Sequence, residues 1–276
     1  MPAAIHIKMA TPRKNKTASR RPARTLDPTI SRRLEQAGLP QALPRGHNML
    51  PRDVVQRSQR ARINEAMAGS VAAKGYAATT VTDITGLAGV SRTTFYEQFR
   101  DKEACYLACF EDQIRYLINR VHAAIATQAT PAGQFVQALA AMLDAAAAEP
   151  IYAHAFIGQA TTVGPNALEA LLDHKARIIR VLREIDARVP RGQRARARLP
   201  LEVFEMAMHG MYEFLSTEIR AGRAARLPQR LPHMCWLWFS ALGLPQWAEA
   251  ALASTPAALR RRDWSEEAPA ADGPGG

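Results

Sequence analysis

Residues 80–102, TVTDITGLAGVSRTTFYEQFRDK, constrain the fold of this chain more than any other stretch, because they predict two short helices joined by a tight turn. Thr80 and Asp83 have the spacing of a capping box, in which each side chain accepts a hydrogen bond from the other residue's backbone N–H. Gly89 is suited to end this first helix, and Ser91 is suited to cap the second. The pattern predicts a helix-turn-helix unit.

The second of these helices should have two unlike faces. Phe95 and Phe99 lie four residues apart and therefore share one face, which we expect to be buried. Arg92, Thr93 and Tyr96 are left on the opposite face. A short helix that buries two aromatic rings and turns a cation, a hydroxyl group and a phenol outward is typical of a recognition helix that reads DNA.

Positive charge is concentrated in the part of the chain that contains this unit. Residues 1–100 hold 17 Lys and Arg against 6 Asp and Glu, whereas residues 101–276 hold 19 of each, so the whole net charge of +11 lies in the first hundred residues. A basic part joined to a neutral, apolar body is typical of a protein that meets a polyanion with one end. The alternative is a basic tail that only keeps the chain soluble, since part of this charge lies in residues 8–33.

The cysteines and the apolar runs indicate the compartment. Cys105, Cys109 and Cys235 form no paired pattern, which favours a reduced, cytoplasmic compartment. Buried thiols are favoured over a metal or redox site built on the first two. The first sixteen residues lack the apolar core of a signal peptide. The most apolar run, residues 234–244, is shorter than the roughly 18 to 20 residues that a membrane span needs, so we expect no membrane contact.

The remaining apolar side chains recur at helical spacing, which predicts an all-α fold: an N-terminal three-helix helix-turn-helix domain followed by a helical-bundle domain for ligand binding and dimerisation. Two alternatives to a disordered N-terminal tail are a short helix at 27–38 and a start of translation at Met49, which would remove most of the tail. The predicted parts are a disordered basic tail (1–50), the helix-turn-helix domain (51–102, motif 80–99), the regulatory and dimerisation domain (103–262) and a disordered tail (263–276).

Caps, prolines and glycines set the expected helix ends. The Arg-rich link at 188–198 is expected to be a solvated loop, with a second anion-binding role as the weaker alternative. A short helix should follow Pro245. The other expected helices are 53–74, the two helices of the motif, 101–127, 131–148, 151–160, 165–189, 201–221 and 228–242.

Four short motifs follow one another in the first half: TTVTDI from Thr79, AGVS at 88–91, the pair Phe95-Tyr96 and the pair Lys102-Glu103. The segment that contains them, from about Arg60 to Glu111, resembles the DNA-binding domain of the TetR family of bacterial transcription regulators. Thr93 stands where many members carry glycine, and Gln98 stands where histidine is frequent. Operator preference therefore does not carry over from the family.

The resemblance implies that the second helix of the motif enters the major groove of double-stranded DNA with its N-terminus first. Arg92 is suited to take guanine O6 and N7 as a bidentate pair, and Tyr96 is suited to a phosphate. Lys102 opposes the dipole of the helix it begins, so we expect a phosphate partner to explain it. The residues expected to contact DNA are Val81, Thr82, Ser91, Arg92, Thr93, Thr94, Tyr96, Gln98 and Lys102.

The second half carries no catalytic motif such as GxSxG or HExxH, so we predict no enzyme, no metal site and no cofactor. Its adaptable and aromatic side chains are more often core than pocket. If a cavity exists, we expect it between helices, for a small apolar or amphipathic effector. The last two long helices, around 204–219 and 234–242, have apolar surface on more than one side, and the resemblance implies a homodimer formed through them. The residues expected to line the cavity are Phe110, Met142, His154, Phe156, His174, Met208 and Tyr212.

The leading hypothesis is a homodimeric repressor that binds a palindromic operator and is released by a small ligand. A ligand would act by favouring a dimer whose two recognition helices no longer match successive major grooves. The first alternative is a regulator without a ligand, which binds constitutively or is controlled by a partner protein. The second is an enzyme with a helix-turn-helix lookalike.

Overall fold

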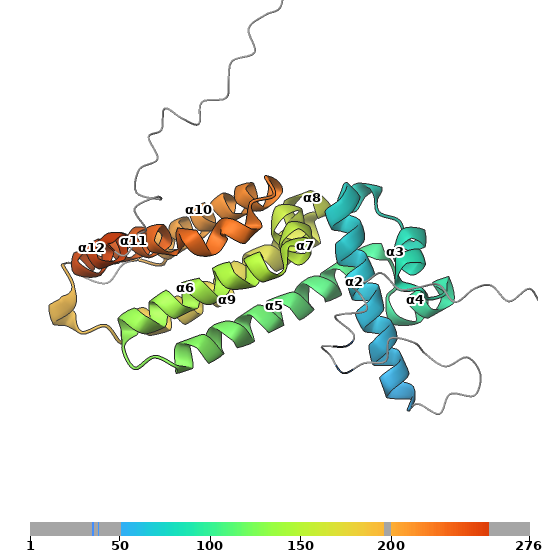
Figure 1. The fold of residues 1–276 in the computed structure, drawn as a ribbon, viewed down its shortest axis with the longest axis horizontal. Helices are drawn as coiled ribbons and strands as arrows, with labels where there is room; N and C mark the ends of the chain where they lie inside the picture. Colours follow the sequence, from blue (N-terminus) through green and yellow to red (C-terminus); the bar gives the residue numbers. More distant parts are fainter. Residues whose placement is uncertain (1–34, 36–37, 39–50, 196–199, 254–276) are drawn as a thin grey trace, which may run out of the picture.

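The computed structural model describes residues 35, 38, 51–195 and 200–253, and most of these lie in helices (Figure 1). The described residues contain no strand, so the all-α fold class is confirmed. Apart from Glu35 and Gly38, the two predicted tails lie outside the described residues, as does the 196–199 part of the Arg-rich link.

The helices divide into a small unit at one end of the molecule and a longer body (Figure 1). The small unit contains α2 (Arg52–Ala78), α3 (Val81–Ala88) and α4 (Arg92–Gln98). The body contains α5 (Lys102–Ala126), α6 (Pro131–Ala148), α7 (Pro150–Ala153), the π-turn His154–Gly158, α8 (Ala160–Val163), α9 (Pro165–Ala187), α10 (Leu201–Arg220), α11 (Leu231–Ala241) and α12 (Pro245–Ala253), with short 3-10 turns at Arg191–Gln193 and Ala224–Arg230.

The predicted capping residues fix the helix-turn-helix. The Asp83 N–H donates to Thr80 Oγ1 at 3.2 Å and the Thr80 N–H donates to Asp83 Oδ2 at 2.8 Å, which completes the capping box of α3. Gly89 ends α3 with a left-handed φ of 67°, a conformation that glycine adopts without a steric cost. The Thr94 N–H donates to Ser91 Oγ at 2.9 Å and so caps α4. The predicted motif is confirmed.

The core of this unit explains why so short a helix as α4 holds its position. Phe95 and Phe99 are both buried, as predicted, and their ring centroids lie 5.6 Å apart. Ile63, Met67 and Ile84 are also fully buried in the same core. Burial of a large apolar side chain stabilises a fold by roughly 1.5 to 3 kcal/mol. The core therefore holds α4 against α2 and leaves its other face to solvent.

The ends of the body helices follow the sequence signals closely, with one exception. The expected helix at 151–160 is instead three pieces, because the backbone forms a π-turn at His154–Gly158 between α7 and α8. Gly158 lies against α10, where a Cβ would stand 3.5 Å from Arg220 Cγ. The prediction of one regular helix here is wrong, since a helical period alone does not reveal a turn with i to i+5 bonding.

The Arg-rich link also differs from its prediction. The side chain of Arg194 is only 4% exposed, and its Nη2 lies 2.6 Å from Asp186 Oδ1. The Ala195 N–H donates to the carbonyl oxygen of Gly243 at 2.9 Å. The expectation of a solvated loop is therefore wrong at Arg194, whose buried ion pair ties the link to the end of α9, whereas residues 190–193 and Ala195 are exposed as expected.

Helix α5 joins the two parts of the molecule. Its Tyr106 is fully buried and donates a hydrogen bond from its hydroxyl to the carbonyl oxygen of Ala155 in the π-turn, at 2.9 Å. Cys105 and Cys109 of α5 are buried thiols, and Cys109 Sγ donates to Asn64 Oδ1 of α2 at 3.1 Å. Among the described helices, none combines the length and the apolar character that crossing a membrane requires.

Candidate DNA interface and ligand cavity

The outer face of α4 is the candidate surface for DNA. Arg92, Thr93 and Tyr96 are exposed, and Tyr96 keeps 50% of its surface accessible. Within the described part of the chain, the Arg92 side chain makes no ion pair or hydrogen bond. A long cationic side chain without a partner, at the first position of an exposed helix, is suited to the edge of a base.

The hydroxyl groups beside Arg92 differ in their freedom. Ser91 Oγ accepts the capping bond of α4 and lies 2.9 Å from Thr94 Oγ1, so these two hydroxyls already bond to each other. Thr93 is exposed, and Gln98 is half-buried. At the start of α3, Thr82 is exposed and Val81 is half-buried. The sequence-predicted DNA contacts therefore gather along the exposed edges of α3 and α4, but only some have free polar groups.

Lys102 has partners inside the protein. Its Nζ donates to the carbonyl oxygens of Tyr76 at 2.9 Å and Thr79 at 2.8 Å, and it lies 4.0 Å from the centroid of the Tyr76 ring. These carbonyls lie beyond the kink at Gly75, where the chain leaves α2, and each accepts a charge-assisted hydrogen bond. Partial burial lowers the pKa of Lys102. The argument that a phosphate is needed to explain this lysine is therefore wrong. The third N–H of the Lys102 ammonium remains available for a phosphate.

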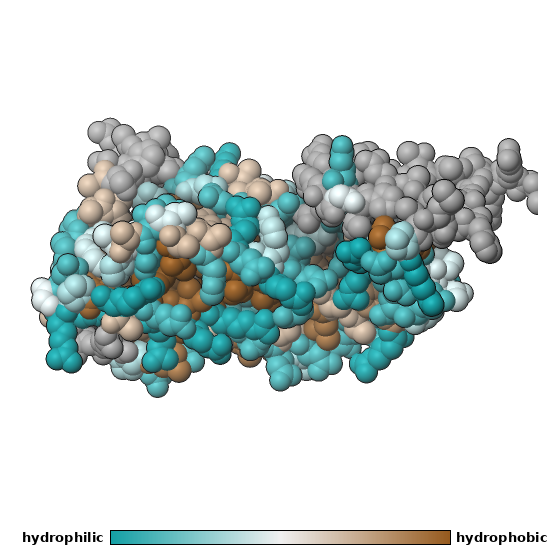
Figure 2. Space-filling view, turned by 90° about the horizontal axis from the view of Figure 1, so that it is seen from below, coloured by the Kyte–Doolittle hydropathy of each residue, from teal (hydrophilic) through white to brown (hydrophobic). Residues whose placement is uncertain are grey.

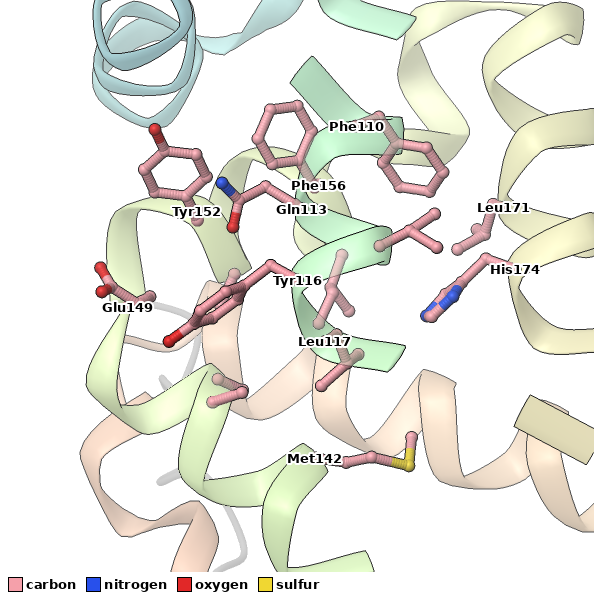
Figure 3. A pocket seen from close by; sticks show the side chains of 15 residues that line it. Phe110, Gln113, Tyr116, Leu117, Met142, Glu149, Tyr152, Phe156, Leu171 and His174 are labelled. Carbon is pink, nitrogen blue, oxygen red and sulfur yellow. The ribbon is translucent and has the colours of Figure 1, made fainter. Parts of the chain in front are cut away.

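A cavity lies in the body between α5, α6, α7 and α9 (Figure 3). The empty space is about 580 Å³, including the part that is open to solvent. Seen from below, the body also exposes a group of apolar side chains bordered by polar ones (Figure 2). The residues that line the cavity are Phe110, Gln113, Ile114, Tyr116, Leu117, Met142, Ala145, Ala146, Glu149, Tyr152, Ala153, Phe156, Ile157, Leu171 and His174.

The most buried polar group of the cavity is His174 of α9, which is 4% exposed. Its Nε2 is hydrogen-bonded to the hydroxyl of Tyr212 on α10. Burial, together with the neighbouring charges of Arg177 and Lys175, lowers the pKa of His174 to about 4, while Asp173 opposes this. The imidazole is therefore neutral near pH 7.

Tyr152 links the cavity to the helix-turn-helix unit. Its ring lines the cavity, and its hydroxyl donates a hydrogen bond of 2.6 Å to Glu65 Oε1 on α2. Figure 3 shows this hydroxyl pointing away from the cavity toward α2. Tyr152 and Glu65 are both buried. This hydrogen bond therefore joins the wall of the cavity to α2.

Residues 65–109 match the family model of bacterial regulatory proteins of the tetR family. The helix-turn-helix segment is therefore of the TetR type. The matched residues run from α2 through α3 and α4 into α5, which are the elements of the helix-turn-helix unit and the helix that leaves it. This family is one of DNA-binding transcription regulators.

Solved structures share the TetR-like fold over about two thirds of this chain. The fatty acid degradation regulator FadR from Bacillus halodurans is 16% identical, over 67% of this chain and 94% of that one, with a TM-score of 0.57. FadR from Bacillus subtilis, solved with stearoyl-CoA, is 18% identical, with coverages of 66% and 97% and a TM-score of 0.58. PfmR, a TetR-family regulator from Thermus thermophilus, is 21% identical, with coverages of 66% and 95% and a TM-score of 0.52. No curated protein sequence matches the chain.

The seven predicted ligand residues occupy different places in the body. Phe110, Met142, Phe156 and His174 line the cavity, and Tyr212 stands behind His174. Met208 and His154 are not among the lining residues. Sequence reasoning did not select the polar lining residues Gln113, Tyr116 and Glu149. Their only sequence signal is that Gln113 and Tyr116 lie three residues apart, on neighbouring turns of α5.

We predict that Lys102→Met lowers the free energy of unfolding by about 1 kcal/mol in the absence of DNA, because two charge-assisted hydrogen bonds to the end of α2 are lost. Urea unfolding measures this. Arg100→Met, which removes an exposed cation two residues earlier, should change stability by less than about 0.5 kcal/mol. An unchanged stability of Lys102→Met would contradict the structural role. If its remaining N–H also reaches a phosphate, the log-log salt slope of duplex binding falls by about 1.

We also predict that stability depends on pH through His174. The folded-state pKa is about 4 and the ordinary value is 6.5, so the unfolded chain binds the proton first and stability is lost as the pH falls through this window. Between pH 7 and pH 5 the parent should lose about 2 kcal/mol more than His174→Gln. His209→Gln, at an exposed position of α10, is the matched control and should follow the parent. Parallel curves for parent and His174→Gln would contradict a buried neutral imidazole.

Proposed function

We propose that this chain is a homodimeric transcriptional repressor that binds an operator through α3 and α4 and is released when a small, mainly apolar ligand enters the cavity of the body. The observation that carries this proposal is the hydrogen bond between Tyr152 and Glu65, because it joins the wall of the cavity to the helix that packs on α3 and α4.

The side chains at the start of α4 support a direct reading of bases. Arg92 is exposed and has no partner in the described residues, so its guanidinium is available for guanine O6 and N7. Thr93, beside it, offers a methyl group for thymine and a hydroxyl group. Tyr96 stands one turn further along and is suited to a phosphate. Val81, Thr82, Ser91, Thr94, Gln98 and Lys102 would complete the contact surface with the DNA backbone.

An apolar stripe on the body supports a two-fold dimer. Met206, Gly210 and Phe214 are spaced by four residues and therefore share the outer face of α10, where a Cβ added to Gly210 would meet no atom within 4 Å. Trp236 and Leu237 continue this exposed apolar surface onto the adjacent α11. Met206, at 65% exposure, is the most accessible side chain of the stripe. A second copy would cover this surface and set the spacing of the two recognition helices.

The coupling between ligand and DNA would be a shift in population between two conformations. A ligand that fits one conformation better favours it by the difference in its binding free energy. Because Tyr152 belongs to the cavity wall and holds Glu65, a ligand that moves this ring changes the position of α2. Near-complete release needs a difference of several kcal/mol, which is of the order of 5.5 kcal/mol for a shift from 1:99 to 99:1.

Arg92→Ala should weaken binding to the operator by about 1 to 3 kcal/mol and relax the preference at one base pair of each half-site, because a bidentate contact to guanine is lost. The operator is obtained by selecting bound duplexes from a random library, and affinities are then measured on singly substituted duplexes. Arg180→Ala, an exposed arginine of α9, is the matched control. An Arg92→Ala protein with the parent's affinity and base preference would exclude this assignment.

Met206→Arg should convert a dimer into a monomer, because a charge would be buried in the centre of the apolar stripe. Sedimentation equilibrium should then give a mass near the 30.3 kDa of one chain instead of twice that value. Ala176→Arg adds the same charge to the exposed face of α9 and should leave the dimer intact. A dimeric Met206→Arg protein would show that the two copies meet elsewhere.

Tyr152→Phe should reduce the effect of the ligand on DNA binding at least about fivefold, because the hydrogen bond to Glu65 is lost. The ligand is the compound of an apolar library that raises the melting temperature of the parent most. Operator affinity without ligand should change by less than about threefold. Tyr106→Phe removes another buried hydroxyl that does not line the cavity and should keep the response. A full ligand response in Tyr152→Phe would refute this route.

A further inference from the structure

One nitrogen of His174 has no hydrogen-bond partner in the part of the chain that the structure describes. The ring points from α9 into the cavity, with its nitrogen-bearing edge toward Leu117 and Met142 (Figure 3). Nε2 is hydrogen-bonded to the hydroxyl of Tyr212, whereas Nδ1 is buried and has no hydrogen-bond partner among the described residues. Buried polar groups of folded proteins are nearly always paired, so an orphaned ring nitrogen at a cavity points to a ligand group.

The contact with Tyr212 decides which nitrogen carries the proton. Burial raises the pKa of Tyr212, which therefore keeps its hydroxyl proton, and a neutral imidazole has one N–H. If Nε2 carried it, the Tyr212 oxygen would accept that N–H, and both the hydroxyl proton of Tyr212 and the lone pair of Nδ1 would be left unpaired. If the hydroxyl instead donates to Nε2, only an Nδ1–H donor is left over. The second arrangement leaves fewer buried groups unpaired, so His174 presents a hydrogen-bond donor to the cavity.

The other lining side chains limit the charge of the ligand. Around His174 the wall consists of Phe110, Leu117, Met142 and Leu171, all of them apolar. None of the fifteen lining residues is a lysine or an arginine, and the one ionisable carboxyl group among them is that of Glu149. A carboxylate ligand would therefore enter an apolar site without a cation to pair with, which is unfavourable.

We propose that the ligand of this cavity is an uncharged, mainly apolar molecule whose carbonyl oxygen accepts a hydrogen bond from the Nδ1–H of His174. The inference rests on the proposed ligand control of DNA binding and specifies the chemistry that the cavity recognises. Contacts with the apolar wall supply affinity, and the single hydrogen bond fixes the orientation of the ligand.

The test compares three probes of nearly equal length: 2-nonanone, which has a carbonyl group, nonane, which has none, and octanoate, which is anionic at pH 8. Equilibrium dialysis with chromatographic quantification gives the dissociation constant of each probe for the full chain. In His174→Phe, the affinity for 2-nonanone should fall about tenfold, the factor that a net hydrogen bond contributes, while that for nonane changes less than threefold. Octanoate should bind the parent more weakly than 2-nonanone.

Two further variants keep the test decisive. His122→Phe makes the same change at an exposed position of α5 outside the cavity and should leave the affinities for all three probes unchanged. If His174→Phe does not fold because the Tyr212 hydroxyl loses its acceptor, the double variant with Tyr212→Phe replaces the pair by two apolar rings, and the same selective loss is expected.

The outcomes separate this inference from the proposed function. Equal losses for 2-nonanone and nonane, or no loss for either, would overturn the role of His174 and leave the apolar ligand site standing. Tighter binding of octanoate than of 2-nonanone would overturn the uncharged class. If none of the three probes binds the parent, the ligand half of the proposed function fails together with the inference.

Discussion

The arrangement of the whole chain depends on the packing of Tyr106 between the helix-turn-helix unit and the body. Its ring is fully buried and lies 5.3 Å from the Tyr76 ring of α2 and 5.1 Å from the Phe156 ring of the π-turn, between centroids. Its hydroxyl bonds to the carbonyl oxygen of Ala155. Because one side chain contacts both parts, they share a core. A displacement in the body therefore meets α2 without a flexible joint in between.

The sequence was sufficient to predict the structure wherever the decisive interaction joins residues that are close together in the chain. Thr80 with Asp83, Ser91 with Thr94, and the left-handed Gly89 act over three or four residues, so their spacing alone predicted the helix-turn-helix. The expected helix at 131–148 likewise matches α6, because a proline begins it and its apolar side chains keep one period. The class of protein followed from these local signals together with the resemblance that they carry.

The hydrogen bonds that surround the cavity of the body could not be predicted from the sequence in this way. Tyr152 and Glu65 are 87 residues apart, and Tyr212 and His174 are 38 apart, so no spacing rule relates them. Composition could not separate the side chains that face the cavity from those that are only core, since Phe110 and Met142 line it and Met208 does not. Lys102 shows a different error. Its charge does oppose the dipole of α5, but carbonyl groups of the protein itself, rather than the expected phosphate, accept its hydrogen bonds.

The cavity and the recognition surface use separate stretches of the chain. Every lining residue falls between Phe110 and His174, whereas the outer face of α4 falls between Arg92 and Gln98. A mutation that enlarges or reshapes the cavity therefore leaves the exposed side chains of α4 unchanged, and the converse also holds. Under the proposed function, such a layout would let descendants of one regulator acquire a new ligand while they keep their operator, or a new operator while they keep their ligand.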